Sequence, residues 1–174
     1  MTKPWYASLF AFFGLACSPT VYTHGVPNLV SVDVDKNVWR SGQPTTPEAW
    51  AYIKSLGVER VVKLNFEEEG TDQGARDLGI EVVYVPIEPK GDLISVVEAV
   101  DSAHVQLAVA ALALPNTLVH CTHGQDRTGA VVGAARVVNY RWSKHQAWLE
   151  MLNNHFHWEL PALMAWWLDF DGKF

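Results

Sequence analysis

One stretch of the sequence decides the fold, and it reads Val119-His120-Cys121-Thr122-His123-Gly124-Gln125-Asp126-Arg127-Thr128-Gly129. Residues 117–120 (Thr-Leu-Val-His) indicate a short strand that runs directly into Cys121. Residues 129–141 are compatible with a helix. In a tight loop at a helix N-terminus, backbone N–H groups point inward and bind a dianionic phosphate, assisted by the helix dipole. The sequence therefore predicts a phosphate-binding loop over residues 122–126.

Two side chains of this stretch suit phosphate chemistry. Arg127 carries a planar guanidinium that can bind two phosphate oxygens at once. Positive surroundings favour the thiolate form of a cysteine, here Cys121. A thiolate below a bound phosphate can attack phosphorus in line and form a phosphocysteine, which water then hydrolyses. This chemistry requires no metal and no cofactor. The expected substrate contacts are Thr122, His123, Gly124, Gln125, Asp126 and Arg127.

The motif His120-Cys121-x5-Arg127-Thr128 resembles the signature of the protein tyrosine and dual-specificity phosphatase superfamily. Upstream, residues 39–44 (Trp-Arg-Ser-Gly-Gln-Pro) are similar to a segment of atypical dual-specificity phosphatases from bacteria, fungi and plants. The resemblance covers about residues 29–170. It implies that Cys121 is the nucleophile, Arg127 the transition-state clamp, Thr128 a hydrogen-bond donor to the thiolate, and His120 a residue that orients the loop. It also implies hydrolysis of phosphomonoesters on tyrosine, serine or threonine, or on an inositol ring.

Enzymes of this superfamily also need a general acid, usually an Asp some thirty residues before the cysteine. Asp92 lies 29 positions before Cys121 and follows Gly91, which suits a mobile loop. Asp92 is equally suited to be a helix N-cap. Asp126 is the rival acid, because Gly-x-Asp-Arg-Thr also resembles the loop of myotubularin-type lipid phosphatases. The sequence leaves both candidates open.

Two other functions remain as alternatives. The stretch from Cys121 to Gly129 also resembles the RNA 5′-triphosphatase branch of the superfamily, although the acidic charge balance weighs against it. A phosphate-binding module without catalysis is the alternative from another functional class. Inactive relatives of such enzymes typically lose the cysteine or the arginine, whereas this sequence has both Cys121 and Arg127. Residues 155–157 (His-Phe-His) are expected to be solvated or packed rather than metal-binding, and residues 67–69 (Glu-Glu-Glu) to form an exposed acidic turn.

The pattern of apolar residues alternates between strands and helices, which predicts an α/β fold: a central, mostly parallel sheet with helices on both faces and the loop at the carboxyl end of one strand. Strands or hairpins are expected at 29–40, 58–65, 80–87 and 117–120. Helices are expected after an N-cap at Thr45 or Thr46, and at 71–78, 92–113, 129–141, 143–153 and 160–169.

Size and charge limit the remaining possibilities. The chain has 174 residues and 49% hydrophobic residues, which suits one domain over 29–174 preceded by a linker at 18–28. We expect a monomer. The formal net charge is −6, so no broad basic face for long nucleic acid is expected. The expected partner is therefore a phosphorylated protein or a small phosphorylated substrate.

The N-terminus has the features of an export signal. Lys3 precedes an uncharged apolar run over residues 4–17 that is too short to span a bilayer comfortably. Cleavage near Ala16 or Ser18, or lipidation of Cys17, would make the protein periplasmic or lipid-anchored, and membrane contact is expected only with lipidation. An apolar helix on a cytoplasmic protein is the alternative. Cys17 and Cys121 are the two cysteines, so no disulfide framework is expected.

Overall fold

The computed structural model describes residues 20–88 and 100–174 of the chain. Its centre is a five-stranded sheet in the order β3–β4–β7–β5–β6. The strands span Val30–Asp33 (β3), Val38–Gly42 (β4), Arg60–Lys63 (β5), Glu81–Tyr84 (β6) and Thr117–Cys121 (β7). All neighbours are parallel except β3, which runs antiparallel to β4. This confirms the predicted α/β fold.

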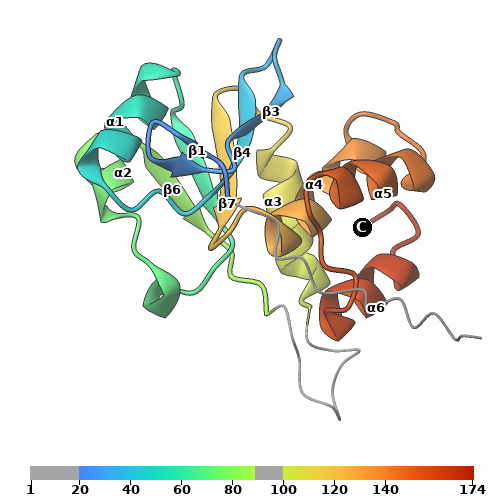
Figure 1. Ribbon diagram of the computed structural model, residues 1–174. Coiled ribbons are helices and arrows are strands. Elements are labelled where there is room, and N and C mark those ends of the chain that lie inside the picture. Colours follow the sequence, from blue (N-terminus) through green and yellow to red (C-terminus); the bar gives the residue numbers. More distant parts are fainter. Residues whose placement is uncertain (1–19, 89–99) are drawn as a thin grey trace, which may run out of the picture.

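Helices cover both faces of the sheet (Figure 1). On one face lie α1 (Pro47–Ser55) and α2 (Gln73–Asp77), and on the other lie α3 (Ser102–Ala111), α4 (Asp126–Val138), α5 (Lys144–Asn153) and α6 (Pro161–Asp169). Each face has its own apolar core, and the larger core lies between the sheet and α3 to α6. No helix within the described ranges reaches the length and apolar character needed to cross a membrane.

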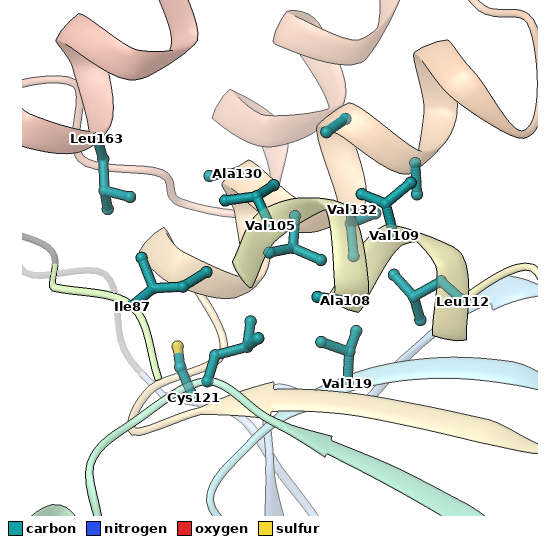
Figure 2. Close-up of a cluster of buried hydrophobic side chains, with 14 of the residues drawn as sticks. Ile87, Val105, Ala108, Val109, Leu112, Val119, Cys121, Ala130, Val132 and Leu163 are labelled. Atoms are coloured by element: carbon teal, nitrogen blue, oxygen red, sulfur yellow. The ribbon is translucent and has the colours of Figure 1, made fainter. Parts of the chain in front are cut away.

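The side chains of β7 explain how this fold positions the phosphate-binding loop. Side chains alternate between the two faces of a strand. Leu118 belongs to the core under α1 and α2, whereas Val119 and Cys121 belong to the core under α3 to α6. Figure 2 shows Cys121 at the end of the strand, among the labelled side chains of this larger core. His120 consequently lies on the opposite face, where its ring is 6.2 Å from that of Trp50.

Several boundaries differ from the sequence-based expectation. The helix expected to start at residue 129 begins at Asp126, because the last residues of the loop already form its first turn. The helix expected over 92–113 is described from Ser102 to Ala111, and residues 92–99 lie outside the described ranges. Asp101 caps α3 by accepting a hydrogen bond from Ala103 N at 2.8 Å. The predicted N-cap at Thr46 is confirmed, and Ser143 caps α5.

The segment expected to be a linker contains a short hairpin. Its strands are β1 (Tyr22–Thr23) and β2 (Val26–Pro27), joined antiparallel. Val26 is fully buried in the core under α1. Asn28 Nδ2 donates a hydrogen bond to His123 O at 2.9 Å, so the hairpin also touches the phosphate-binding loop. Burial of a valine and this contact explain why residues 20–28 are ordered rather than a free tether.

Candidate active site

The loop between β7 and α4 crosses the end of β4 at very short range. In the parallel register Gly42 pairs with Cys121 and Ser41 with His120, so the two sequence motifs lie side by side. Gly124 has a φ of +75°, and a Cβ there would lie 2.4 Å from Gly42 N. Gln43 N donates to Thr122 O at 3.1 Å. Only glycine at position 124 permits both the left-handed conformation and this approach.

Arg40 binds the backbone of the loop through its guanidinium. Its side chain is buried, and Nη2 donates to Gly124 O at 2.7 Å and to Gln125 O at 3.5 Å. Burial lowers the pKa of Arg40 to about 10, although the negative charges of Glu150 and Cys121 act in the opposite direction. Arg40 stays protonated at neutral pH. The buried guanidinium therefore fixes two carbonyl groups of the loop.

Arg127 is held by a carboxylate that the sequence did not reveal. Its Nη1 lies 2.8 Å from Glu69 Oε2 and its Nη2 donates to Glu69 Oε1 at 3.1 Å. Thr122 Oγ1 donates to Glu69 Oε2 at 2.9 Å. Partial burial raises the pKa of Glu69, but the hydrogen bonds from Arg127 and Thr122 and the charge of Arg127 outweigh it and lower the pKa overall.

The expected exposed acidic turn is confirmed at residues 67–69, and Glu69 in addition binds Arg127 and Thr122. It ends the 3₁₀ helix η1 (Glu67–Glu69), which follows β5. β5 and β7 are parallel neighbours, and the carboxyl ends of parallel strands meet at one edge of the sheet. That position, rather than the run of three glutamates, was the signal that could have placed Glu69 beside the loop.

His120 is anchored in a fully buried polar network. Its Nε2 lies 2.9 Å from Asp72 Oδ2, and neither side chain is exposed. Gln43 Nε2 donates to Asp72 Oδ1 at 2.7 Å, and Lys63 Nζ lies 3.9 Å from the same oxygen. Lys63 also donates to Gly70 O, which ties down the segment that carries Glu69. Asp72 therefore holds the ring of His120, which is the residue predicted to orient the loop.

Burial also governs the charges of this network. It raises the pKa of Asp72, but the hydrogen bond and charge of His120, together with Gln43 and Lys63, lower it overall. It lowers the pKa of Lys63, and the attraction of Asp72 offsets this only in part. A buried carboxylate with three partners remains ionised, so the network is held together by charge as well as by hydrogen bonds.

The side chain of Asp126 is bound to His157, which lies between α5 and α6. Its Oδ1 accepts hydrogen bonds from the backbone N of His157 at 2.8 Å and from His157 Nδ1 at 2.9 Å. The side chain of His157 is 36% exposed and that of Asp126 is 18% exposed. His157 was expected to be solvated or packed, and it is partly exposed and packed against Asp126. No group of three or more metal-ligating side chains occurs among the residues described.

The other site residues predicted from the sequence have different environments. Thr128 Oγ1 is buried without a hydrogen-bond partner, so the predicted bond to the thiolate is not formed here. His123 is exposed at the loop surface and Gln125 is buried. Asp92 lies outside the described ranges, as does Cys17. Cys121 is 3% exposed and unpaired.

The fold and the loop together define a class, the proteins built on the fold of the cysteine-dependent phosphatases. Within that class, residues 26–154 match the tyrosine phosphatase family, and the chain belongs to this family. This confirms the resemblance inferred from the motif.

Known proteins agree with that assignment. The inositol diphosphatase DSP4 of Arabidopsis thaliana is 31% identical over 120 residues, which are 67% of this chain and 59% of that protein. The core catalytic domain of the PP-IP phosphatase SIW14 from S. cerevisiae has a TM-score of 0.64 at 20% identity, covering 83% of this chain and 85% of that chain. P. aeruginosa TpbA in complex with pTyr has a TM-score of 0.61 at 22% identity, covering 83% and 90%. The two structures show that the fold is shared.

Proposed function

We propose that this protein hydrolyses phosphomonoesters, with Cys121 as nucleophile and Arg127 as the clamp of the transition state. The observation that carries the proposal is the carboxylate of Glu69, which is bound by the two Nη atoms of Arg127 and by the hydroxyl of Thr122. Groups arranged to hold one oxyanion at the mouth of a strand–loop–helix turn suit a phosphate at the same place.

The proposed reaction has two steps. The thiolate of Cys121 attacks phosphorus, the P–O bond to the leaving group breaks, and the leaving oxygen takes up a proton. Water then attacks the phosphocysteine, the P–S bond breaks, and inorganic phosphate and the thiolate are released. Arg127 and the loop N–H groups stabilise the charge of both transition states. The buried hydroxyl of Thr128, which has no partner, is available to donate to the departing sulfur.

For the substrate, we propose a singly phosphorylated group of the phosphotyrosine type. Two carboxylates lie at the described part of the site, because Glu69 binds Arg127 and Thr122, and Asp126 begins α4 directly after the loop. Such surroundings repel a substrate that carries several phosphates. The complex of TpbA with pTyr supports this substrate class. An inositol diphosphate is the second candidate, supported by the similarity to DSP4.

A panel of substrates tests the proposal. The full chain is incubated with phosphotyrosine peptide, phosphoserine peptide, an inositol pyrophosphate and triphosphorylated RNA, and released phosphate is measured. We expect the highest kcat/KM for phosphotyrosine peptide, inhibition by vanadate, and complete loss in Cys121→Ser. Preference for the inositol pyrophosphate would favour the second candidate, and preference for the RNA would favour a triphosphatase. Binding without turnover would favour the phosphate-binding module.

We also propose that the protein is exported. The apolar run over residues 4–17 behind Lys3 supports this. Mass spectrometry of the native protein should find a new N-terminus near residue 17 or a lipid on Cys17. A chain that begins with Met1 would overturn the export and favour a cytoplasmic protein.

A further inference from the structure

Three consecutive carbonyl groups of the phosphate-binding loop accept hydrogen bonds from donors outside the loop. In chain order, Thr122 O accepts from Gln43 N at 3.1 Å, His123 O from Asn28 Nδ2 at 2.9 Å and Gly124 O from Arg40 Nη2 at 2.7 Å. All three donors come from residues 28–43, the stretch that runs from the end of the hairpin β1–β2 through β4. The first part of the described chain therefore holds the backbone of the loop.

The direction of each carbonyl group determines the direction of the N–H group that follows it. In a planar trans peptide, the C=O of one residue and the N–H of the next point in opposite directions. When Asn28 binds His123 O, the N–H of Gly124 therefore points away from the hairpin. Successive N–H groups that face one side of a loop bind an anion there.

Asn28 is fixed at both ends of its side-chain amide. Its Oδ1 accepts from Val21 N at 3.0 Å, and its backbone N donates to Val21 O at 2.7 Å. The adjacent Pro27 is buried, and a Cβ at Gly42 would lie 3.0 Å from both Pro27 Cβ and His123 C. The oxygen of the amide thus closes the hairpin, while its nitrogen binds the loop.

We propose that Asn28 is a positioning residue of the active site, which directs the N–H of Gly124 toward the bound phosphate by holding the carbonyl group of His123. This inference deepens the proposed function and rests on it for the identity of the ligand. Asn28 acts through the peptide between His123 and Gly124. Without its hydrogen bond, that peptide can rotate and bring a carbonyl oxygen toward the phosphate, which repels it.

Asn28 is also the donor that can be removed most cleanly. Gln43 donates through its backbone, and Arg40 is a buried charge. Asn28 has a φ of +47°, which glycine adopts without strain. In Asn28→Gly, the dissociation constant of inorganic phosphate, measured by titration calorimetry on the full chain, should rise about tenfold. The kcat/KM for nitrophenyl phosphate should fall about tenfold or more.

Two control variants separate this contact from a general loss of structure. Asn37, before β4, has a φ of +55°, and its Nδ2 also donates to a backbone carbonyl, Leu56 O, at 2.9 Å. Asn37→Gly removes the same kind of bond at the opposite end of β4. Within the hairpin, His24 has a φ of +49° and stacks on Tyr52 with ring centroids 4.1 Å apart. Asn37→Gly and His24→Gly should both leave phosphate binding and kcat/KM unchanged.

A further variant keeps the hairpin closed. Asn28→Asp retains an oxygen for Val21 N and a residue type that tolerates a positive φ. It has no donor for His123 O, and its charge opposes the phosphate. It should therefore weaken phosphate binding at least as much as Asn28→Gly does.

Nuclear magnetic resonance measures the proposed N–H contact directly. When phosphate is added to the unchanged protein, the amide proton of Gly124 should move to lower field, because a charge-assisted hydrogen bond is short and strong. At saturating phosphate this shift should be smaller in Asn28→Gly and unchanged in Asn37→Gly. A purely structural role of Asn28 would lower stability without changing the shift.

The contrary outcomes distinguish the inference from the proposed function. Unchanged phosphate binding in Asn28→Gly would overturn the role of Asn28 and leave the phosphatase function intact. Equal losses in His24→Gly would also overturn it, because the hairpin as a whole would then be responsible. Phosphate binding that depends on Asn28 in a protein that hydrolyses none of the esters would support the inference and overturn the proposed function.

Discussion

The two faces of β7 support the phosphate-binding loop in opposite ways. On the face of α1 and α2, His120, Asp72 and Lys63 have no exposed side-chain surface and are linked by hydrogen bonds and charge. On the face of α3 to α6, the pair Asp126–His157 is partly exposed and is joined through a single carboxylate oxygen. Both sets of residues contain an Asp–His pair, and one strand separates them.

The difference lies in how far each pair is exposed to water. A buried pair keeps its charges and its geometry, because separating either partner from the other is costly. A pair in contact with solvent gains little stability. We infer that the buried face sets the position of the loop and that the partly exposed pair contributes little to the stability of the fold. Changes in the buried network should therefore reduce stability strongly, and changes in the partly exposed pair should reduce it little.

The largest effect on stability is expected from Asp72→Asn. The change removes the charge that balances Lys63 and weakens the bond to His120, so the free energy of unfolding should fall by about 3–5 kcal/mol. Urea denaturation measures it. Asp77→Asn, at an exposed site on α2, should change stability by less than about 0.5 kcal/mol. Adding Lys63→Met to Asp72→Asn should recover part of the loss, and a further loss instead would contradict a charge-balanced pair.

Stability should also depend on pH through Asp72. Its pKa in the folded protein is lowered, so its contribution is complete above the ordinary value of about 4 and is lost as pH falls through the lowered value. The difference in stability between the unchanged protein and Asp72→Asn should therefore shrink below about pH 4. A constant difference down to pH 2 would show that Asp72 contributes by packing alone.

The next effect is expected from Gly124→Ala, which acts where the loop crosses β4. A Cβ would meet Gly42 N and Ser41 C at 2.4 Å, and the residue has a positive φ. We expect a loss of about 2 kcal/mol or more and loss of phosphatase activity, because the loop must move away from β4. Gly79→Ala is the matched control, since Gly79 has a φ of +67° but open space around it. It should cost about 1 kcal/mol and leave kcat unchanged.

These examples show which features the sequence could predict. The motif from His120 to Thr128 is contiguous, and its chemistry follows from residue types and spacing, so the loop was predictable, as was the alternation of strands and helices along the chain. Helix caps such as Ser143 were also predictable, because they depend on residues three or four positions apart.

The residues that the sequence did not reveal lie close to the motif only because of how the chain folds around the sheet. Glu69, Asp72 and His157 lie 58, 48 and 31 positions from the residues of the motif 119–129 that they contact. No local pattern predicts such pairs, because their proximity results from parallel strands that end at one edge and from a helix pair that folds back. Asp72 is an ordinary helix-start residue by sequence, and only its burial beside His120 reveals its role.

A smaller effect is expected from Glu69→Gln, at the boundary between the two faces. The glutamate side chain is 35% exposed, so its removal should change stability by less than about 1 kcal/mol. The inhibition constant for inorganic phosphate should fall about three- to tenfold, since a negative charge beside the bound dianion is lost. The kcat should also fall, because Arg127 is then held less firmly. Glu68→Gln is the control on the same turn, and an equal change there would indicate a general charge effect.

The smallest effect on stability is expected from His157→Gln, which changes the partly exposed partner of Asp126. The glutamine keeps the backbone N–H that binds Asp126 and loses only a partly exposed side-chain contact, so unfolding should change by less than about 0.5 kcal/mol. Thermal unfolding with the unchanged protein alongside measures this. A loss comparable to that of Asp72→Asn would mean that both Asp–His pairs are structural, and the contrast between the two faces of β7 would disappear.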